Sequence, residues 1–325
     1  MINRRNALLL APALALSRPA LAQATRFPDR PIRLIIPFAA GGSNDIVGRV
    51  ITDGMATRLG QTFVVENRGG AGGVLGNEAV AQSPKDGYTI LLSGSGSFLI
   101  SSLVQPRVPY DIIKDFAPIG FVGNAPNVIT VNPQVEAKTM GELRDLARRA
   151  RPPLAYASPG VGTTGHVLGA LLSLEFGAEM EHIPYRGTGP AITDVLAGRV
   201  QILTNAAAPL RPHIAAGGLR AVAVAAPRRL DFLPEVPTTV EQGFPNVLSS
   251  TWYGLLAPTG TPADRVTALH AALNATLADA AVKQRLQEEG VEIEPSPTPA
   301  DYGRFIEQDR KRWQEVVTRA NIRAE

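Results

Sequence analysis

The sequence contains no cysteine and only four histidines. Without cysteine there is no disulfide, no thiol nucleophile, no thiolate metal site and no lipid attached through an N-terminal cysteine. The histidines have neither metal-ligand spacing nor an H-E-x-x-H pattern, and they are His166, His182, His213 and His270. We therefore expect no metal, no cofactor and a core built by hydrophobic packing alone.

Long hydrophobic runs are also missing, apart from one near the N-terminus. Residues 7–16 are apolar, follow Arg4 and Arg5, and precede an A-x-A pattern at residues 20–22. The run is too short to cross a bilayer, and the arrangement is typical of a cleaved secretory signal. We expect residues 1–22 to be removed, with cleavage near Ala22 and Gln23, and export to the periplasm. The arginine pair leaves both the general and the twin-arginine export route open.

The net charge of +3 belongs to the expected signal, which holds Arg4, Arg5 and Arg18 and no acidic residue. The mature chain therefore has a formal charge of 3 minus 3, or zero. This balance does not favour a nucleic acid or an anionic membrane as a partner. Its length of about 300 residues suggests two domains.

Short apolar runs alternate with helical patterns, which predicts an α/β fold with mostly parallel sheets flanked by helices. Ser43 is expected to cap the helix that follows it, and Thr139 with Glu142 forms a capping box. Trp313 is expected in the core. Strands are predicted over 33–37, 63–66, 88–92, 116–122, 128–131, 154–157, 180–184, 201–204, 221–225 and 251–256. Helices are predicted over 44–59, 74–82, 140–150, 164–176, 189–197, 262–277, 280–289 and 299–320.

Two glycine-rich turns each follow a predicted strand and precede a predicted helix, at residues 37–45 and 158–166. Each aims free backbone N–H groups of a helix N-terminus beyond the strand ends, where they attract anions without a charged side chain. Two such turns facing each other across a cleft would hold a small molecule with carboxylate groups.

Residues 160–165 also match G-x-G-x-x-G, the dinucleotide-binding pattern. However, Glu179 and Glu181 fall before or early in the next strand, whereas the ribose-binding acid belongs at its end. Export also argues against a diffusible nicotinamide cofactor. The glycines still allow a small anion to approach the backbone. A tight turn without any ligand is the alternative.

Four side chains near these turns have two readings each. Asp45 either complements the helix dipole or meets an amine or a bridging water. His166 either donates to a carboxylate or fixes its turn. Arg186 is either a carboxylate partner or a solvated surface residue, and Tyr185 either walls the pocket or belongs to the core. A serine hydrolase is not indicated, because no G-x-S-x-G pattern is present.

A set of ordered motifs runs along the mature chain, at residues 27–42, 65–68, 72–73, 84–89, 184–187, 194–198, 233–238, 252–258 and 260–262. Together these motifs resemble the Bug receptors, the extracytoplasmic binding proteins of tripartite tricarboxylate transporters. No single motif is specific, but the set runs in the same order over essentially the whole mature chain.

The resemblance implies a two-domain periplasmic binding protein of the Venus-flytrap type (type II), with two interdomain crossings and a ligand between the lobes. Lobe 1 is expected over residues 23–124 and 252–325, and lobe 2 over 125–251. The implied ligand is a small carboxylate, namely a di- or tricarboxylate, an acidic amino acid or an aromatic carboxylate, held with bridging waters. The implied partners are membrane transporter subunits that bind transiently, and the protein is expected to be a monomer.

Carried onto this sequence, the resemblance places ligand contacts in the two glycine turns and two further loops. The expected site residues are Phe38, Ala40, Gly42, Ser43, Asp45, Ser93, Ser95, Ser158, Gly162, Thr163, Thr164, His166, Tyr185, Arg186, Gly187 and Asn205. Asn205 stands where many relatives carry an acid. Its presence argues against an amine-bearing ligand and favours a purely anionic or neutral-tailed one.

We therefore predict a solute-binding receptor without catalytic residues, which captures a small carboxylate by lobe closure. An exported α/β hydrolase or isomerase is the first alternative, and it would need a positioned nucleophile or base. A binding component of a sensory system is the second, and it would share the receptor's binding chemistry.

Overall fold

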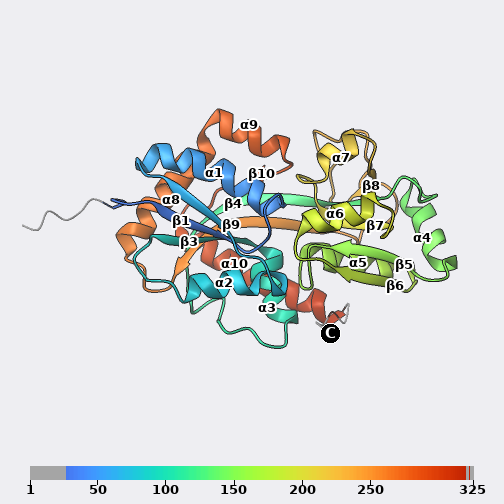
Figure 1. Ribbon diagram of the computed structural model, residues 1–325, viewed down its shortest axis with the longest axis horizontal. Helices are drawn as coiled ribbons and strands as arrows, with labels where there is room; N and C mark the ends of the chain where they lie inside the picture. Colours follow the sequence, from blue (N-terminus) through green and yellow to red (C-terminus); the bar gives the residue numbers. More distant parts are fainter. Residues whose placement is uncertain (1–26, 320–321, 323–325) are drawn as a thin grey trace, which may run out of the picture.

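The computed structural model describes residues 27–319 and 322, so the predicted signal peptide and its cleavage site lie outside the described residues. Two α/β lobes lie side by side and are joined by two long strands, β4 (Phe116–Val131) and β9 (Ser250–Pro258) (Figure 1). Lobe 1 contains β1 (Ile32–Ile36), α1 (Ser43–Leu59), β2 (Phe63–Asn67), α2 (Val74–Ala81), β3 (Thr89–Gly94), α3 (Ser101–Val104), α8 (Ala263–Ala278), α9 (Ala280–Glu288), β10 (Glu292–Ile293) and α10 (Pro299–Arg319). Lobe 2 contains α4 (Met140–Arg149), β5 (Leu154–Ser158), α5 (Thr164–Phe176), β6 (Met180–Pro184), α6 (Thr188–Leu196), β7 (Ile202–Ala206), α7 (Arg211–Ala215) and β8 (Arg220–Val224).

The crossing strands are shared by both halves of one mixed sheet. In lobe 1 the strand order is β2-β1-β3-β9-β4, with β10 beside β4. In lobe 2 strand β4 lies between β7 and β8, and the order continues through β5 to β6. The β1–β2, β1–β3, β5–β6 and β5–β7 pairs are parallel, whereas the crossing strands join antiparallel. This topology confirms the predicted fold with two crossings.

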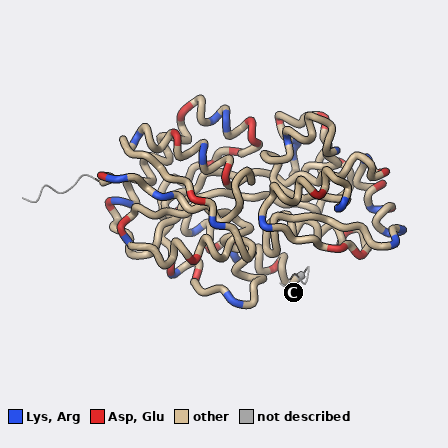
Figure 2. Tube along the Cα trace, in the orientation of Figure 1, with Lys and Arg blue, Asp and Glu red and all other residues tan. Residues whose placement is uncertain are grey.

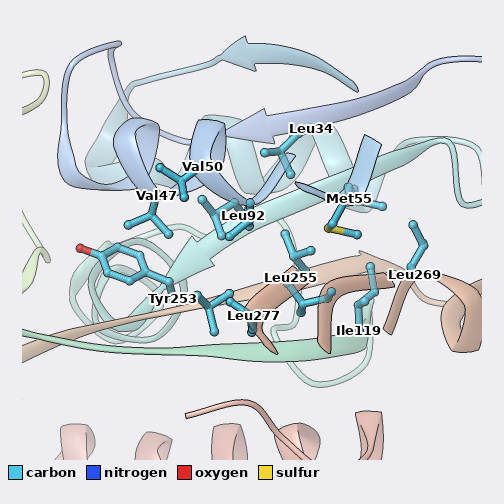
Figure 3. Close-up of a cluster of buried hydrophobic side chains, with 14 of the residues drawn as sticks. Leu34, Val47, Val50, Met55, Leu92, Ile119, Tyr253, Leu255, Leu269 and Leu277 are labelled. Atoms are coloured by element: carbon cyan, nitrogen blue, oxygen red, sulfur yellow. The ribbon is translucent and has the colours of Figure 1, made fainter. Parts of the chain in front are cut away.

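Helix α1 packs on the lobe 1 sheet through an apolar face. The spacing predicts Ile46, Val50, Ile51 and Met55 on this face, and the structure buries the last three together with Val47 in place of Ile46. Val47, Val50 and Met55 recur at helical spacing and meet Leu34 and Leu92 from the sheet (Figure 3). All five side chains are at most 5% exposed. Burying each such side chain contributes about 1.5–3 kcal/mol, so the packing of α1 fixes where the turn before it lies.

The structure corrects the prediction of two separate strands over 116–122 and 128–131. Strand β4 is continuous, because it pairs with β9 throughout the crossing and absorbs two register shifts. Gly123, at φ +154°, lies at the second shift and packs against the backbone of β10. The predicted lobe boundaries at 124/125 and 251/252 fall inside these crossing strands.

Two other local predictions are confirmed, and some short elements were not predicted. The Thr139–Glu142 capping box is confirmed, and Trp313 is buried as expected. The helical turns of residues 95–104, together with α7 and β10, were not predicted.

The crossing strands contain no lysine, arginine, aspartate or glutamate. The trace between the lobes is accordingly tan in Figure 2. Lysine, arginine and acidic residues lie mainly on the helices and turns around them. Across the described residues, no helix combines the length and the apolar character needed to span a bilayer.

Candidate functional site

The first glycine turn is tied together by a buried carboxylate. Helix α1 has Gly42 as its N-cap and no side-chain capping bond, so the predicted capping role of Ser43 is wrong. Ser43 lies one position inside the helix. Asp45 instead accepts hydrogen bonds from the Gly41 N–H (2.9 Å) and from Asn67 Nδ2 (3.0 Å).

These contacts keep Asp45 ionised although it is only 5% exposed. Burial raises the pKa of Asp45, but hydrogen bonds from Arg49, Gly41 and Asn67 outweigh burial and hold the pKa below its ordinary value. A carboxylate in the first turn also offsets the positive end of the helix dipole. Arg49 forms an ion pair with the same carboxylate (3.0 Å), but its guanidinium is 52% exposed and therefore screened by solvent. The buried carboxylate thus offsets part of the positive end of α1.

The second glycine turn has no acid in the first turn of its helix. Thr163 is the N-cap of α5, and its hydroxyl accepts from the His166 N–H (3.3 Å). Gly162, at φ +79°, donates its N–H to His166 Nδ1 (3.2 Å). A Cβ on Gly165 would lie 2.2 Å from the Thr204 carbonyl oxygen, so glycine lets α5 begin directly against β7. The positive end of α5 is thus both fixed and uncompensated.

His166 is neutral in this turn and stacks on His182, with ring centroids 3.9 Å apart. Burial lowers the pKa of His166 to about 4. Burial and the neighbouring His166 lower the pKa of His182 to about 3. With Nδ1 accepting from the backbone, His166 fixes its turn in this structure.

A cavity of about 30 Å³ lies where the two turns meet. We call it the cleft cavity. Half of its lining residues belong to the predicted set, namely Phe38, Gly42, Ser43, Thr163, Thr164 and Asn205. The other half were not named individually, although Asn44, Ser97, Pro159 and Thr188 lie in the loops where the resemblance places ligand contacts. They are Asn44, Gly94, Gly96, Ser97, Pro159 and Thr188. No charged side chain is among the lining residues of this cavity.

Two asparagines give the cleft cavity amide groups. Asn44 is 3% exposed, and its Nδ2 has no hydrogen-bond partner among the described residues. Asn205 Nδ2 donates to Thr188 Oγ1 (3.2 Å). Asn44 lies in the first glycine turn and also in the first turn of α1. This position in the sequence was the signal that could have identified it.

The lobes are in direct contact at two places. From lobe 1, the Ser101 hydroxyl donates to the Gly162 carbonyl oxygen of lobe 2 (3.5 Å). From lobe 2, Arg211 Nη1 donates to the Glu288 carbonyl oxygen of lobe 1 (2.6 Å). Residues of both lobes line the cleft cavity.

Several predicted site residues do not line the cleft cavity, namely Ala40, Asp45, Ser93, Ser95, Ser158, Gly162, His166 and Gly187. The serines among them make contacts within the protein. Ser93 Oγ lies 2.7 Å from Ser97 Oγ, and Ser95 Oγ donates to the Ser250 carbonyl oxygen (3.3 Å). These residues support the loops that line the cavity.

Tyr185 and Arg186 line a neighbouring cavity of about 200 Å³, which shares Phe38 and Pro159 with the cleft cavity. The Tyr185 hydroxyl donates to Asp194 Oδ2 (2.7 Å), and burial followed by that bond raises the pKa of Tyr185 to about 12. Arg186 is exposed. Both residues lie beside the cleft cavity.

Comparison with known proteins identifies the family. Residues 47–322 match the family described as the tripartite tricarboxylate transporter family receptor. The chain belongs to this family. The match includes α5, the crossing strands and most of α1, and it begins after the first glycine turn.

Solved structures of similar proteins agree with this assignment. The receptor is 32% identical to the periplasmic binding protein BugD, with a TM-score of 0.86 over 92% of this chain and 100% of that chain. It is 30% identical to MatC from Rhodopseudomonas palustris with bound malate (TM-score 0.83, 90% and 100% covered). It is 31% identical to R. palustris Rpa4515 with adipate (TM-score 0.87, 91% and 99% covered). The receptor is thus a two-lobe solute-binding protein of the periplasmic type.

One pair in the receptor has the composition of a hydrolytic dyad. Ser158 Oγ lies 2.7 Å from His182 Nε2. Yet Ser158 is fully buried and also bonds to the Gly160 backbone (3.2 Å), and a histidine with a pKa of about 3 is a weak base near neutral pH. The pair therefore stabilises the second turn. Among the described residues, no group of histidine, aspartate and glutamate has the arrangement of a metal site.

Proposed function

We propose that this receptor captures a small, purely anionic carboxylate between its lobes and delivers it to a membrane transporter. The observation that carries the proposal is an uncharged cavity beside an uncompensated helix N-terminus. Backbone N–H groups and the helix dipole favour a bound anion there. The malate and adipate complexes of similar proteins support the same ligand class.

The first lobe adds neutral donors to this anion site. Asn44 Nδ2 is a buried donor that needs an acceptor, because an unpaired buried amide costs about 1–3 kcal/mol. A ligand oxygen, or a water that bridges to one, would satisfy it. Asn205 adds no negative charge, so the cavity lacks a counter-charge for an ammonium group. Di- and tricarboxylates and aromatic carboxylates fit this site better than an acidic amino acid does.

Ligand access requires the lobes to separate. A cavity of about 30 Å³ holds roughly one or two water molecules and no dicarboxylate. We infer that the ligand enters an open form and that its contacts with both turns then favour the closed form, as in hinge closure generally. Such a receptor needs no catalytic group, and we propose that it acts as a monomer.

A thermal-shift screen tests the proposal. The mature protein would be melted with malate, adipate, an aromatic carboxylate, aspartate, a simple amine and a sugar. A ligand at a hundred times its Kd adds about 2.7 kcal/mol to the free energy of unfolding, so at least one carboxylate should raise the Tm clearly. Shifts by the amine or the sugar alone would contradict the proposal. Turnover of a shifting carboxylate, followed by NMR, would support the enzyme alternative instead.

A further inference from the structure

A second cavity, of about 430 Å³, is lined by both lobes and by the crossing strands. We call it the hinge cavity. Ala226 and Leu248 form its wall on the lobe 2 side. Phe305 and Trp313 of α10 form its wall on the lobe 1 side, with Trp252 of β9 between the walls.

The hinge cavity and the cleft cavity lie on opposite sides of the crossing strands. In lobe 1 the strand order is β3-β9-β4-β10, with cleft residues at the end of β3 and a hinge-cavity residue, Glu292, on β10. In lobe 2 the order is β7-β4-β8, with Asn205 on β7 and Ala226 just after β8. The order along the sheet does not separate the two cavities, because β9 and β7 lie on opposite sides of β4. The two faces of β9 separate them, since successive side chains of a strand point to opposite faces.

Successive residues of β9 contact the two sides. The Thr251 hydroxyl lies 2.6 Å from the Thr164 hydroxyl at the start of α5. The next residue, Trp252, lines the hinge cavity and donates its Nε1 hydrogen to Asp309 Oδ2 (2.6 Å). Trp313 Nε1 donates to the same oxygen (2.9 Å). These bonds fix the lobe 1 wall of the hinge cavity to β9. The lobe 2 wall is fixed to β4, because the Ala225 N–H donates to the Asn127 carbonyl oxygen (2.8 Å). The two walls can therefore approach each other only when the crossing strands bend or twist between them.

A rotation that opens the cleft about β4 and β9 must bring the two walls behind the strands closer together. We propose that the hinge cavity is the space that lobe opening removes, so that the volume of the side chains in it sets the balance between open and closed forms. Filling the cavity from the lobe 2 side then favours the closed form. The effect on ligand affinity rests on the proposed function, whereas the effect on lobe opening does not.

The test is a wedge substitution, Leu248→Trp. Leu248 is half-buried in the lobe 2 wall, and an indole there would obstruct opening. The matched control is Val240→Trp, which places the same ring on an exposed position of lobe 2 outside the hinge cavity. Arg228→Trp, from an exposed side chain at the cavity's rim, repeats the test without touching the core. Arg228→Gln is its control, because both changes remove the ion pair of Arg228 with Glu292 of lobe 1 (3.7 Å). Circular dichroism and cooperative melting establish that each variant folds.

Small-angle X-ray scattering without ligand is the first measurement. The Leu248→Trp and Arg228→Trp variants should have a smaller radius of gyration than wild type and the Val240→Trp control. Equal values for wedges and control would overturn the inference. A ligand-free wild type already as compact as the closed structure would overturn it too, because there would be no open form to suppress.

Calorimetric titration with the carboxylate that shifts the Tm most is the second measurement. The wedges should bind it about fivefold or more tightly than the control, the lower end of the usual coupling range. Wedges that compact the protein while no carboxylate binds any variant would refute the proposed function and leave the hinge inference standing. Compaction without a gain in affinity for a bound carboxylate would refute the link to the cleft.

Discussion

The two glycine turns look alike in sequence, yet the N-termini of the helices that follow them differ in charge. In the lobe 1 turn, Asp45 accepts the Gly41 N–H and supplies a negative charge to the first turn of α1. In the lobe 2 turn, Thr163 and His166 accept backbone N–H groups as neutral partners, and α5 has no acid in its first turn.

This difference indicates that the two helix N-termini have different roles in the site. A compensated terminus orders its loop and presents neutral donors, whereas an uncompensated one attracts charge. We infer that the ligand's carboxylate is held by the end of α5 and that lobe 1 contributes neutral contacts, among them Asn44. Lobe 2 would then set affinity for anions, and lobe 1 would set the fit of what lies beyond the carboxylate.

The largest expected effect comes from making the second turn resemble the first. Thr164→Asp places a carboxylate in the first turn of α5 beside the cleft cavity. Two like charges about 5 Å apart at an effective dielectric constant of about 20 repel by about 3 kcal/mol, so carboxylate affinity should fall about a hundredfold. Thr164→Asn is the neutral control of similar shape, and calorimetry should show it losing far less. Equal losses in the two variants would mean that charge at this terminus does not decide binding.

A somewhat smaller effect is expected when charge is added across the cavity. Asn205→Asp should weaken dicarboxylate binding by roughly tenfold or more, again by repulsion. Binding of aspartate, whose ammonium group gains a partner, should weaken less or improve. The ratio of the two Kd values, measured for wild type and variant, isolates the role of this position. An unchanged ratio would remove Asn205 from ligand discrimination.

Removing the hydroxyls of the second turn comes next. The double change Thr163→Ala with Thr164→Ala should weaken carboxylate binding about tenfold, because two lost hydrogen bonds at about 0.7 kcal/mol each, within the usual range, remove about 1.4 kcal/mol. The loss of the Thr163 cap should also lower the free energy of unfolding by about 1 kcal/mol. Urea unfolding and calorimetry measure the two effects separately. Affinity equal to wild type would exclude the hydroxyls from the site.

The sequence predicted the helices, the crossings and the two turns because periodicity and glycine placement are local signals. It missed what depends on tertiary contacts. Ser43 was predicted to cap α1, but the turn is held instead by Asp45. Asp45 accepts a hydrogen bond from Asn67 of β2, which is distant in sequence. The continuity of β4 follows from pairing with β9, which is distant in sequence. Asn44 lies in a turn that the sequence predicted, but its unpartnered amide is recognisable only once its surroundings are known.

Asp45→Asn tests the compensated turn, with little expected change in ligand affinity. Weakening its hydrogen bonds should lower the free energy of unfolding by about 1–3 kcal/mol at pH 7. Since the folded pKa of Asp45 is lowered, its stabilisation is complete above the unfolded pKa of about 3.9 and is lost as the pH falls through the folded pKa. Urea unfolding of both proteins should therefore show a difference that shrinks on acidification. A large drop in affinity without a drop in stability would place Asp45 in the ligand site.

The smallest effect on binding is expected from the pH. With a folded pKa of about 4, His166 stays neutral between pH 6.5 and 8, so carboxylate affinity should be flat there; an imidazolium donor would make it fall as the pH rises. Stability behaves differently, because the unfolded chain binds the proton at about pH 6.5. The free energy of unfolding should therefore decrease as the pH falls from about 6.5 towards 4. His166→Gln, which cannot titrate, should reduce this decrease while leaving the pH profile of affinity unchanged. The remaining decrease comes from His182, whose folded pKa of about 3 acts in the same direction. Affinity that rose steeply on mild acidification in wild type alone would show that His166 serves the ligand directly.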